Sequence, residues 1–528
     1  NYAEALSVSG RLDEVEKIFN LILTKVNNKH EKAKTHAKYS EILHHLGKTI
    51  PAFKEASKGL AIFGIEFPST PDKIKAEAEP LIAELIQAET IKKLAGLNSA
   101  GETDTLIGRL YDRAIISAYF SHSDDLKLVI GKSVKHILDC GLTPQSGIAI
   151  AWFATILAMM ERKGLSLSYA ELAINIAQRF NDSYFSGTTK VLAYGFSLCW
   201  KHSFSDNNQL LQEAFLLCHN TGNLQFASYA LLCKYIGSLT QSADCNEVLE
   251  TCQQWHDYCE KYATLELGQA KIRLNCISQL MDCDRKQLNI EQILATYTNA
   301  NNYLDVCGAL IEIARIETLF GNYKVGYETC KRAEPMLLAG AAGSLVIQVT
   351  FYHFYSICCA RLYGLESHEE LKQEYLAQLK SNLEKFSHWL DLNMDNFYSY
   401  YVLIKAEIAR AQADREKAIF YYLRTINHAK KHSYTLLQAV ANEFLAELYA
   451  IDQHRFAKGR FEEAHCLYLQ CGAKAKARIL SEKLPQIFQR QGEASAFLDP
   501  STSVTLSSRT TERYCRTLDL ESVIKASQ

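Results

Sequence analysis

The chain has 528 residues, of which 48% are hydrophobic and 22% are charged. This composition is typical of a folded protein with a large core, and the length predicts three or four globular domains or one long repeat array. The 57 Lys and Arg residues nearly balance the 59 Asp and Glu residues, which leaves a formal net charge of −2. Such a balance argues against nucleic-acid binding, which needs a concentrated positive face, and against a role at membrane surfaces.

Helical patterning runs along nearly the whole chain. Apolar residues recur at i, i+3, i+4 and i+7 in most windows, as they do on one face of a helix. The sequence has no convincing period-two alternation and no Asn-Gly or Asp-Gly turn between β-branched runs, which are the signals of β-hairpins. Pro and Gly are few, at 8 and 25 residues. We therefore predict an all-α fold of helices joined by short polar breaks.

A repeat is visible in the first predicted region, residues 1–98, and in the third, residues 301–488. A small residue at a turn is followed by packing residues at offsets of +2, +5, +9 and +12, as in Tyr323, Gly326, Cys330 and Ala333. These offsets match the second helix of a tetratricopeptide repeat. The fold is therefore predicted to be a TPR-like α-solenoid, a superhelix of antiparallel helix pairs. The turn residues are Gly10, Gly47, Gly321, Ala413 and Gly459.

The regions between and after these repeats are less regular. Residues 99–300 keep helical hairpins but match the offsets weakly, so they are predicted to be a degenerate helical-repeat middle. Residues 489–516 are rich in Ser and Thr and are predicted to be a linker. Residues 517–528, "TLDLESVIKASQ", have the pattern of a helix that has only begun. Both ends of the chain look cut, so we expect an internal piece of a larger protein.

Two stretches are apolar enough to be compared with membrane spans. The stretch "GIAIAWFATILAMM" at 147–160 is too short to cross a bilayer. The stretch at 336–360 lacks charged residues but contains a Gln, a His and several hydroxyl groups. We interpret both as helices that are buried on all sides, and we expect no membrane insertion.

The 16 cysteines do not indicate disulfide bonds or a metal site. Cys245, Cys252 and Cys259 are seven residues apart, which places them on one face of a helix as small buried hydrophobic residues. Their number and setting predict reduced thiols in a cytoplasmic protein. The segment "HCLYLQC" at 465–471 lacks a fourth ligand, and Cys471 is already a packing residue of the repeat. We therefore expect no metal and no cofactor.

Catalytic motifs are missing from the sequence. It contains no phosphate-binding loop, no G-x-G-x-x-G, no H-E-x-x-H, no G-x-S-x-G and no kinase signature of the H-R-D or D-F-G type. We therefore predict that this segment is not an enzyme and that it has no catalytic or cofactor-binding residues.

Two aromatic clusters are candidates for partner recognition, at 350–359 ("TFYHFYSICC") and 396–410 ("NFYSYYVLIKAEIAR"). Core packing is the leading interpretation, and a recognition groove on the concave face is the alternative. The basic runs at 428–432 ("HAKKH") and 473–478 ("AKAKAR") are interpreted as cations at helix ends, with an acidic partner site as the alternative. The candidate groove contacts are Tyr352, Tyr355, Tyr398 and Tyr401.

The sequence also resembles a known family in blocks that follow the same order. These blocks include "LSVSGRLDEVEKIFNLIL", "GKTIPAFKEASKGLAIFGIEFP", "NTGNLQFASYALL", "HCLYLQCGAKAKARILSEKLPQ" and "LDLESVIKASQ". Together they are similar to the helical repeat region of very large bacterial multi-sensor signalling kinases. In that family the order is a Ser/Thr kinase domain, a STAND/AAA-type ATPase, this helical region, a GAF sensor and often a histidine kinase.

The resemblance implies a non-catalytic sensor and coupling region of a kinase and ATP-binding parent whose active-site residues lie outside residues 1–528. It also implies contact with protein partners or with the neighbouring ATPase, kinase and GAF domains. Residues 517–528 would then lead into the GAF domain, and Leu520 and Ile524 are predicted to be contacts of a short parallel homodimer. Two alternatives remain open: the inducer-binding repeat region of a STAND-type transcription activator, and a free-standing scaffold or effector.

Overall fold

The architecture is an α-solenoid in which every regular element of the described residues is a helix, as the sequence predicts. Apart from the helices, the described part has one isolated bridge, between Ser99 and Leu142. The structure is a computed structural model, and it describes residues 12–121, 125–242, 244–262, 264, 266–282, 291–292, 294–295, 303–339, 341–451 and 454–488.

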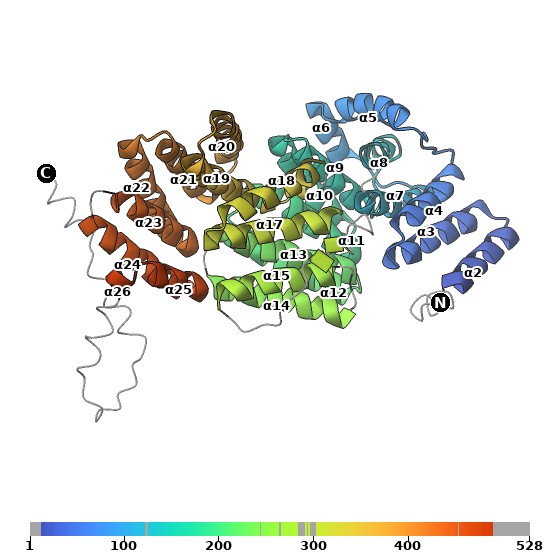
Figure 1. Ribbon diagram of the computed structural model, residues 1–528. Coiled ribbons are helices and arrows are strands. Elements are labelled where there is room, and N and C mark those ends of the chain that lie inside the picture. The colour runs from blue at the N-terminus through green and yellow to red at the C-terminus, as the bar shows by residue number, and fades with distance from the viewer. Residues whose placement is uncertain are drawn as a thin grey trace.

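The first half of the chain begins with helices of the N-terminal region and continues into the middle of the solenoid (Figure 1). Its elements are α2 (Leu12–Lys25), α3 (Lys29–His45), α4 (Thr49–Ala61), α5 (Pro71–Leu85), α6 (Ala88–Gly96), α7 (Glu102–Phe120), α8 (Leu126–Cys140), α9 (Ser146–Met159), α10 (Lys163–Arg179), α11 (Ser183–Phe196), η1 (Leu198–Trp200), α12 (Phe204–Asn220), α13 (Leu224–Gln241), α14 (Cys245–Tyr262) and α15 (Leu267–Leu280).

The second half continues the stack toward the left of Figure 1. The predicted linker 489–516 and connector helix 517–528 lie outside the described residues. The elements are α17 (Tyr303–Phe320), α18 (Tyr323–Ala339), η2 (Ala341–Ser344), α19 (Ile347–Leu365), α20 (Glu369–Leu390), α21 (Met394–Ala411), α22 (Arg415–Lys431), α23 (Thr435–Tyr449), α24 (His454–Gln470), α25 (Lys474–Lys483) and α26 (Pro485–Phe488).

The turns between paired helices lie where the repeat offsets predict them in three cases. Gly47, Gly321 and Ala413 have φ angles of 73°, 88° and 59°, and the second helix of each pair begins two residues later. This left-handed conformation is the usual end of a helix before a tight turn. Gly10 lies outside the described residues. The predicted turn at Gly459 is wrong, because Gly459 lies inside α24, which begins at His454.

Close approach between neighbouring helices explains the small residues of the repeat. A Cβ atom on Gly326 of α18 would lie 2.7 Å from Thr318 Oγ1 of α17 and 2.8 Å from Cys358 Sγ of α19, which is closer than such atoms can approach. Cys330 and Ala333, at the next two repeat positions, are both fully buried. The sequence therefore identified the packing face of α18 correctly.

Hydrogen bonds between residues far apart in the sequence hold the C-terminal helices against the middle of the solenoid. The Leu436 amide donates to the Ser242 carbonyl at 2.9 Å, and the Cys245 amide donates to the Cys471 carbonyl at 2.8 Å. Asn396 Nδ2 donates to the His202 carbonyl at 2.8 Å. Helix α25 consequently lies beside α15 (Figure 1). The C-terminal helices are thus anchored to the middle of the chain rather than only to their sequence neighbours.

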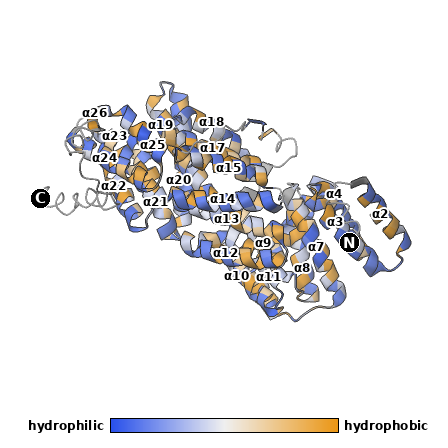
Figure 2. Ribbon diagram, turned by 90° about the horizontal axis from the view of Figure 1, so that it is seen from below, coloured by the Kyte–Doolittle hydropathy of each residue, from blue (hydrophilic) through white to orange (hydrophobic). Residues whose placement is uncertain are grey.

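A single hydrophobic core extends from Ala33 to Leu480, and two small clusters flank it near the N-terminal helices. Hydrophobic residues concentrate where helices face each other, and hydrophilic residues line the outer edges (Figure 2). Cys245, Cys252 and Cys259 are 3%, 0% and 0% exposed, which confirms that they pack as small hydrophobic residues.

The two apolar stretches of the sequence are interior helices. The first forms most of α9, in which residues 146–158 are all buried. The second is interrupted by η2 and continues into α19, whose first 15 residues are buried. Among the described residues, no helix combines the length and the hydropathy that a bilayer crossing requires.

Candidate functional site

The four candidate tyrosines fall into two environments. Tyr352 and Tyr355 of α19 are 1% and 2% exposed, and their rings pack against Trp389 and Tyr327. They have almost no surface to offer to a partner. Tyr398 and Tyr401 of α21 are partly exposed and remain candidates. The predicted dimer contacts Leu520 and Ile524 lie outside the described residues.

Local sequence determines which face of α21 is exposed. Asn393 caps the helix by accepting a hydrogen bond from the Asn396 amide at 3.0 Å. Helical periodicity then buries Phe397, Tyr400 and Leu403 at 0–2% exposure. Tyr398, Tyr401 and Lys405 are rotated away from that buried face, so they lie at the edge between α21 and α22.

The facing edge of α22 is built in the same way. Asp414 caps this helix by accepting from the Lys417 amide at 3.2 Å. Ala418, Tyr422 and Thr425, which occupy repeat positions, are fully buried. The remaining edge presents Phe420, Tyr421 and Arg424, with Phe420 50% exposed.

Cations and aromatic rings from the two helices form one continuous set of contacts. Lys405 Nζ lies 5.4 Å from the ring centroid of Tyr401 and 4.6 Å from that of Tyr421. Phe420 packs edge-to-face on Tyr421 at 5.4 Å. Arg424 donates to the Tyr398 hydroxyl at 3.2 Å, and its guanidinium lies 4.7 Å from the Phe420 ring. We name this surface the α21–α22 ridge; it consists of Tyr398, Tyr401, Lys405, Phe420, Tyr421 and Arg424.

The charge of the ridge is not neutralised locally. Within the part of the chain that the structure describes, neither Lys405 nor Arg424 forms an ion pair with a carboxylate. Their positive charges lie over aromatic faces, a favourable arrangement that still leaves each cation able to bind an anion. Aromatic and Arg side chains are also the residues that contribute most often to protein interfaces. The ridge therefore suits a ligand that presents both carboxylates and apolar side chains.

A buried charge network holds the helices beneath the ridge in place. Arg361 of α19 pairs with Glu407 of α21 and with Glu447 of α23, and Arg410 of α21 approaches Glu447 at 3.1 Å. Burial acts to raise the pKa of Glu447, but the two arginines outweigh it and hold that pKa below its usual range. The network thus connects three consecutive inner helices of the solenoid.

A second buried pair extends this network to the end of the described chain. Glu443 of α23 accepts from Lys476 Nζ at 2.9 Å and from the Tyr468 hydroxyl at 2.5 Å. Lys476 belongs to the run "AKAKAR", which lies at the N-terminal end of α25 rather than at the C-terminal end of a helix, where cations complement the helix dipole. The interpretation of this run as C-terminal cations is therefore wrong, whereas Lys430 and Lys431 do lie in the last turn of α22.

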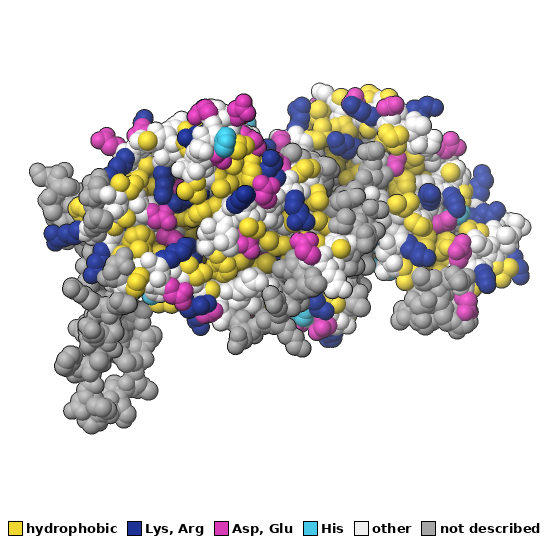
Figure 3. Space-filling view, in the orientation of Figure 1, with side chains coloured by type: hydrophobic (Ala, Val, Ile, Leu, Met, Phe, Trp, Pro, Cys, Tyr) yellow, Lys and Arg dark blue, Asp and Glu magenta, His cyan; other side chains and the backbone are white. Residues whose placement is uncertain are grey.

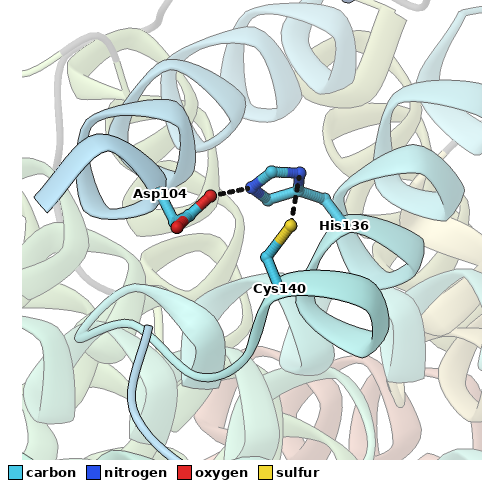
Figure 4. Close-up of side chains that lie close together, drawn as sticks. All are labelled: Asp104, His136 and Cys140. Atoms are coloured by element: carbon cyan, nitrogen blue, oxygen red, sulfur yellow. Dashed lines mark hydrogen bonds and ion pairs between the residues drawn. The ribbon is translucent and has the colours of Figure 1, made fainter. Parts of the chain in front are cut away.

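Asp104, His136 and Cys140 form a separate cluster between α7 and α8 (Figure 4). His136 Nε2 lies 3.2 Å from Asp104 Oδ1, and His136 Nδ1 lies 3.9 Å from Cys140 Sγ. An aspartate, a histidine and a cysteine in this arrangement can activate a thiol when the histidine takes its proton. Here the environment of Cys140 favours the neutral thiol instead. Burial and Asp104 raise the pKa of Cys140, which is the last residue of α8, at the negative end of the helix dipole.

A cleft of about 520 Å³ lies between the start of α10 and the end of α20. Lys163, only 5% exposed, lies in it with Nζ 4.2 Å from the Trp200 ring and 3.1 Å from Glu161. Burial lowers the pKa of Lys163, and the nearby Glu161 partly opposes this effect. Lys385 and Trp389 also line the cleft.

The surface drawn in Figure 3 has Lys and Arg side chains interspersed with Asp and Glu. This face therefore carries no broad field of one sign, in agreement with the formal net charge of −2.

Comparisons with known proteins give only distant likenesses. No protein-family model matches the chain, and no curated protein matches it. Solved structures that align with it include a monomeric mutant of IFIT1 bound to Gppp-AAAA, with 11% identity, a TM-score of 0.33, and 74% of this chain and 99% of that chain covered. A STAND protein with a tetratricopeptide repeat sensor from Pyrococcus horikoshii aligns with 12% identity, a TM-score of 0.27, and 89% of this chain and 66% of that chain covered. At such scores the likenesses carry no functional conclusion.

Proposed function

We propose that this chain is a helical-repeat interaction and coupling region of a multidomain bacterial signalling kinase and ATPase, and that the α21–α22 ridge binds an acidic protein segment. The segment would belong to a partner or to a neighbouring domain of the same polypeptide. The observation that carries the proposal is the continuous aromatic ridge in which Lys405 and Arg424 lack a carboxylate partner among the described residues. The resemblance to the helical region of signalling kinases supports the coupling role.

The buried charge network supports transmission from this surface. Ridge residues on α21 share their helix with Glu407 and Arg410, which pair through Arg361 and Glu447 to α19 and α23. A ligand that shifts α21 relative to α19 and α23 must therefore rearrange ion pairs in the core. Packed and ion-paired interfaces change between discrete arrangements, and such changes can pass to a following domain.

The binding proposal can be tested with a synthetic peptide that alternates Glu with Phe, compared with the same peptide in which Gln replaces Glu. We expect the acidic peptide to bind more tightly, because only it offers carboxylates to Lys405 and Arg424. Each of the variants Lys405→Glu and Arg424→Glu should weaken binding roughly fivefold, as expected for about 1 kcal/mol per exposed charge. Fluorescence anisotropy at low and high salt provides the measurement.

The matched control is Lys380→Glu, which makes the same charge change at an exposed position of α20, a helix that contributes no residue to the ridge. It should leave peptide affinity unchanged. Equal binding of the Glu and Gln peptides, or an equal loss of affinity in Lys380→Glu, would refute the ridge as the docking surface.

The coupling role makes a prediction about the gene as well. The reading frame that continues beyond residue 528 should encode a GAF domain. A helix-turn-helix domain there would instead support the alternative of a STAND-type transcription activator.

The inducer-binding alternative has one structural feature in its favour, the cleft beside Lys163. Its volume of about 520 Å³ is within the range of small-molecule sites, and Lys163 and Lys385 supply positive charge next to the Trp389 ring. A small aromatic carboxylate is the ligand class that these groups suit. Binding of a panel of such acids to the full chain, with loss in Lys385→Gln, would support this alternative and would leave peptide binding at the ridge unaffected.

A further inference from the structure

Two histidines and one aspartate meet where the N-terminal end of α21 lies beside the C-terminal end of α22. His428 and His432 are four residues apart, and their rings stack at 4.3 Å with an interplanar angle of 26°. Asp395 lies in the first turn of α21. One ligand atom from each of the three residues lies within 4.8 Å of the other two. Residues four apart on a helix share one face, which is how paired histidines reach a common ion.

A hydrogen bond orients the His428 ring, and Tyr434 packs beside the His432 ring. The Ser399 hydroxyl, which is fully buried, lies 2.7 Å from His428 Nδ1 and so leaves Nε2 of that ring as the available ligand atom. The Tyr434 hydroxyl donates to the Asp395 carbonyl at 3.3 Å, and its ring lies 6.1 Å from that of His432. A second partner such as Ser399 fixes the ring orientation and the tautomer of a metal-binding histidine.

One ring nitrogen of the cluster lacks a hydrogen bond. His432 Nε2 is buried, has no hydrogen-bond partner among the described residues, and lies 3.6 Å from Asp395 Oδ1. A buried polar atom without a partner destabilises a folded protein. An ion held between His432, His428 and Asp395 would satisfy this atom.

We propose that Asp395, His428 and His432 bind a divalent transition-metal ion of the zinc class. Two imidazole nitrogens and one carboxylate oxygen suit zinc and its first-row neighbours, whereas calcium and magnesium prefer sites made of oxygen ligands alone. The three side chains leave one coordination position open. Small side-chain rotations bring the ligand atoms from their present separation to coordination distance, because Asp395 is 69% exposed and free to move.

The cluster of Asp104, His136 and Cys140 is arranged less favourably for one ion. Its carboxylate and thiol lie at opposite nitrogens of the His136 ring (Figure 4). For both groups to bind an ion held at one nitrogen of that ring, the carboxylate or the thiol has to leave its present position. Cys140 is nevertheless an exposed thiol, so it must be removed from the test.

The test uses the full chain with Cys140→Ser and Zn²⁺ alone as the probe. Isothermal titration calorimetry should detect one ion per chain. Asp395→Asn and His432→Gln should each abolish this binding, and Ser399→Ala should weaken it by about 10- to 100-fold, because the hydroxyl that orients the His428 ring is lost. His368→Gln, which replaces a histidine that is 78% exposed just before the start of α20, should change nothing.

Co²⁺ substitution gives an independent readout of the ligands. The visible spectrum should show d–d bands without a sulfur-to-cobalt charge-transfer band, because the site contains no thiolate. Unchanged Zn²⁺ binding in folded Asp395→Asn and His432→Gln proteins, a thiolate band, or no Zn²⁺ binding by the starting protein would each overturn the proposal. Circular dichroism confirms folding, and the exposure of Asp395 makes Asp395→Asn the safest variant.

Discussion

At the scale of single residues, Arg361 joins two carboxylates in the buried charge network of the C-terminal helices. Its side chain is 8% exposed and lies between two carboxylates, with its guanidinium 3.8 Å from the Phe444 ring. Removing it leaves the buried Glu407 and the partly buried Glu447 without their shared partner. A buried charge without a partner is more costly than the intact pair is stabilising.

We therefore predict that Arg361→Ala lowers the free energy of unfolding by about 3–5 kcal/mol. Arg410→Ala should cost clearly less, because Arg410 is 26% exposed and water can replace its contact with Glu447. Urea denaturation of the two variants measures the difference. Equal losses would show that the charge network does not depend on Arg361.

The second prediction at this scale concerns pH. Burial lowers the pKa of His353 to about 3, from an ordinary value of 6.5. The folded chain thus keeps His353 neutral while the unfolded chain binds a proton below pH 6.5, so stability falls as the pH drops from 6.5 toward 3. His353→Phe should reduce this loss by about 1.4 kcal/mol per pH unit. Urea denaturation at several pH values provides the test, with His368→Phe as the exposed control; an unchanged slope in His353→Phe would contradict the prediction.

At the scale of helices, the repeat offsets predicted burial better than they predicted turns. Phe461, Ala464, Tyr468 and Cys471 are buried as expected, although Gly459 lies inside α24. The offsets report which face of a helix packs, and that face is the same wherever the helix begins. Gly459 misled the turn assignment because a glycine in an open helical position leaves no trace in the hydrophobic pattern.

This difference gives a paired prediction for two glycines. Gly459→Ala should stabilise the protein by about 0.5–1 kcal/mol, since no atom lies within 4 Å of the added Cβ and the helix loses a flexible residue. Gly321→Ala should destabilise it by about 1 kcal/mol, because its φ of 88° strains any residue with a Cβ atom. Thermal unfolding of both variants measures the signs. Changes of the same sign would contradict the helix boundaries.

The candidate sites show a similar limit of sequence reasoning. Local patterning selected Tyr398 and Tyr401, which lie on the ridge, but it also selected Tyr352 and Tyr355, which are buried where α19 packs on the other helices of the stack. The spacing of His428 and His432 was visible in "HAKKH", although the run was interpreted as a basic helix end, with an acidic partner site as the alternative. Asp395 could not be connected to them, because only the packing of α21 on α22 brings it close.

At the scale of the whole molecule, residues that are far apart in the sequence contact one another and connect the helices of the solenoid. Trp200 Nε1 donates to the Ser344 carbonyl at 2.8 Å, and the Trp200 ring packs on Trp389 at 5.0 Å. The sequence predicted the repeat class but not these connections, because the residues that make the contacts are ordinary core and turn residues. In our account the solenoid presents the ridge and passes its state to a following domain.

The coupling account predicts a dimer in the longer protein. A polypeptide that extends through the domain after residue 528 should dimerise through the predicted connector helix 517–528, and light scattering should show twice the monomer mass. Leu520→Asp combined with Ile524→Asp should abolish the dimer by placing charges in the apolar seam. A monomeric longer protein, or a double variant that still dimerises, would contradict this mode of coupling.

The central claim is that the ridge recognises an acidic, aromatic protein segment, and a charge-swap measurement tests it most directly. The protein with Lys405→Glu and Arg424→Glu is titrated, alongside the unchanged chain, with the Glu–Phe peptide and with the same peptide carrying Lys in place of Glu. Our account predicts that the unchanged chain prefers the acidic peptide and that the double variant prefers the basic one. If both proteins show the same preference, or neither binds either peptide, the ridge is not the docking surface.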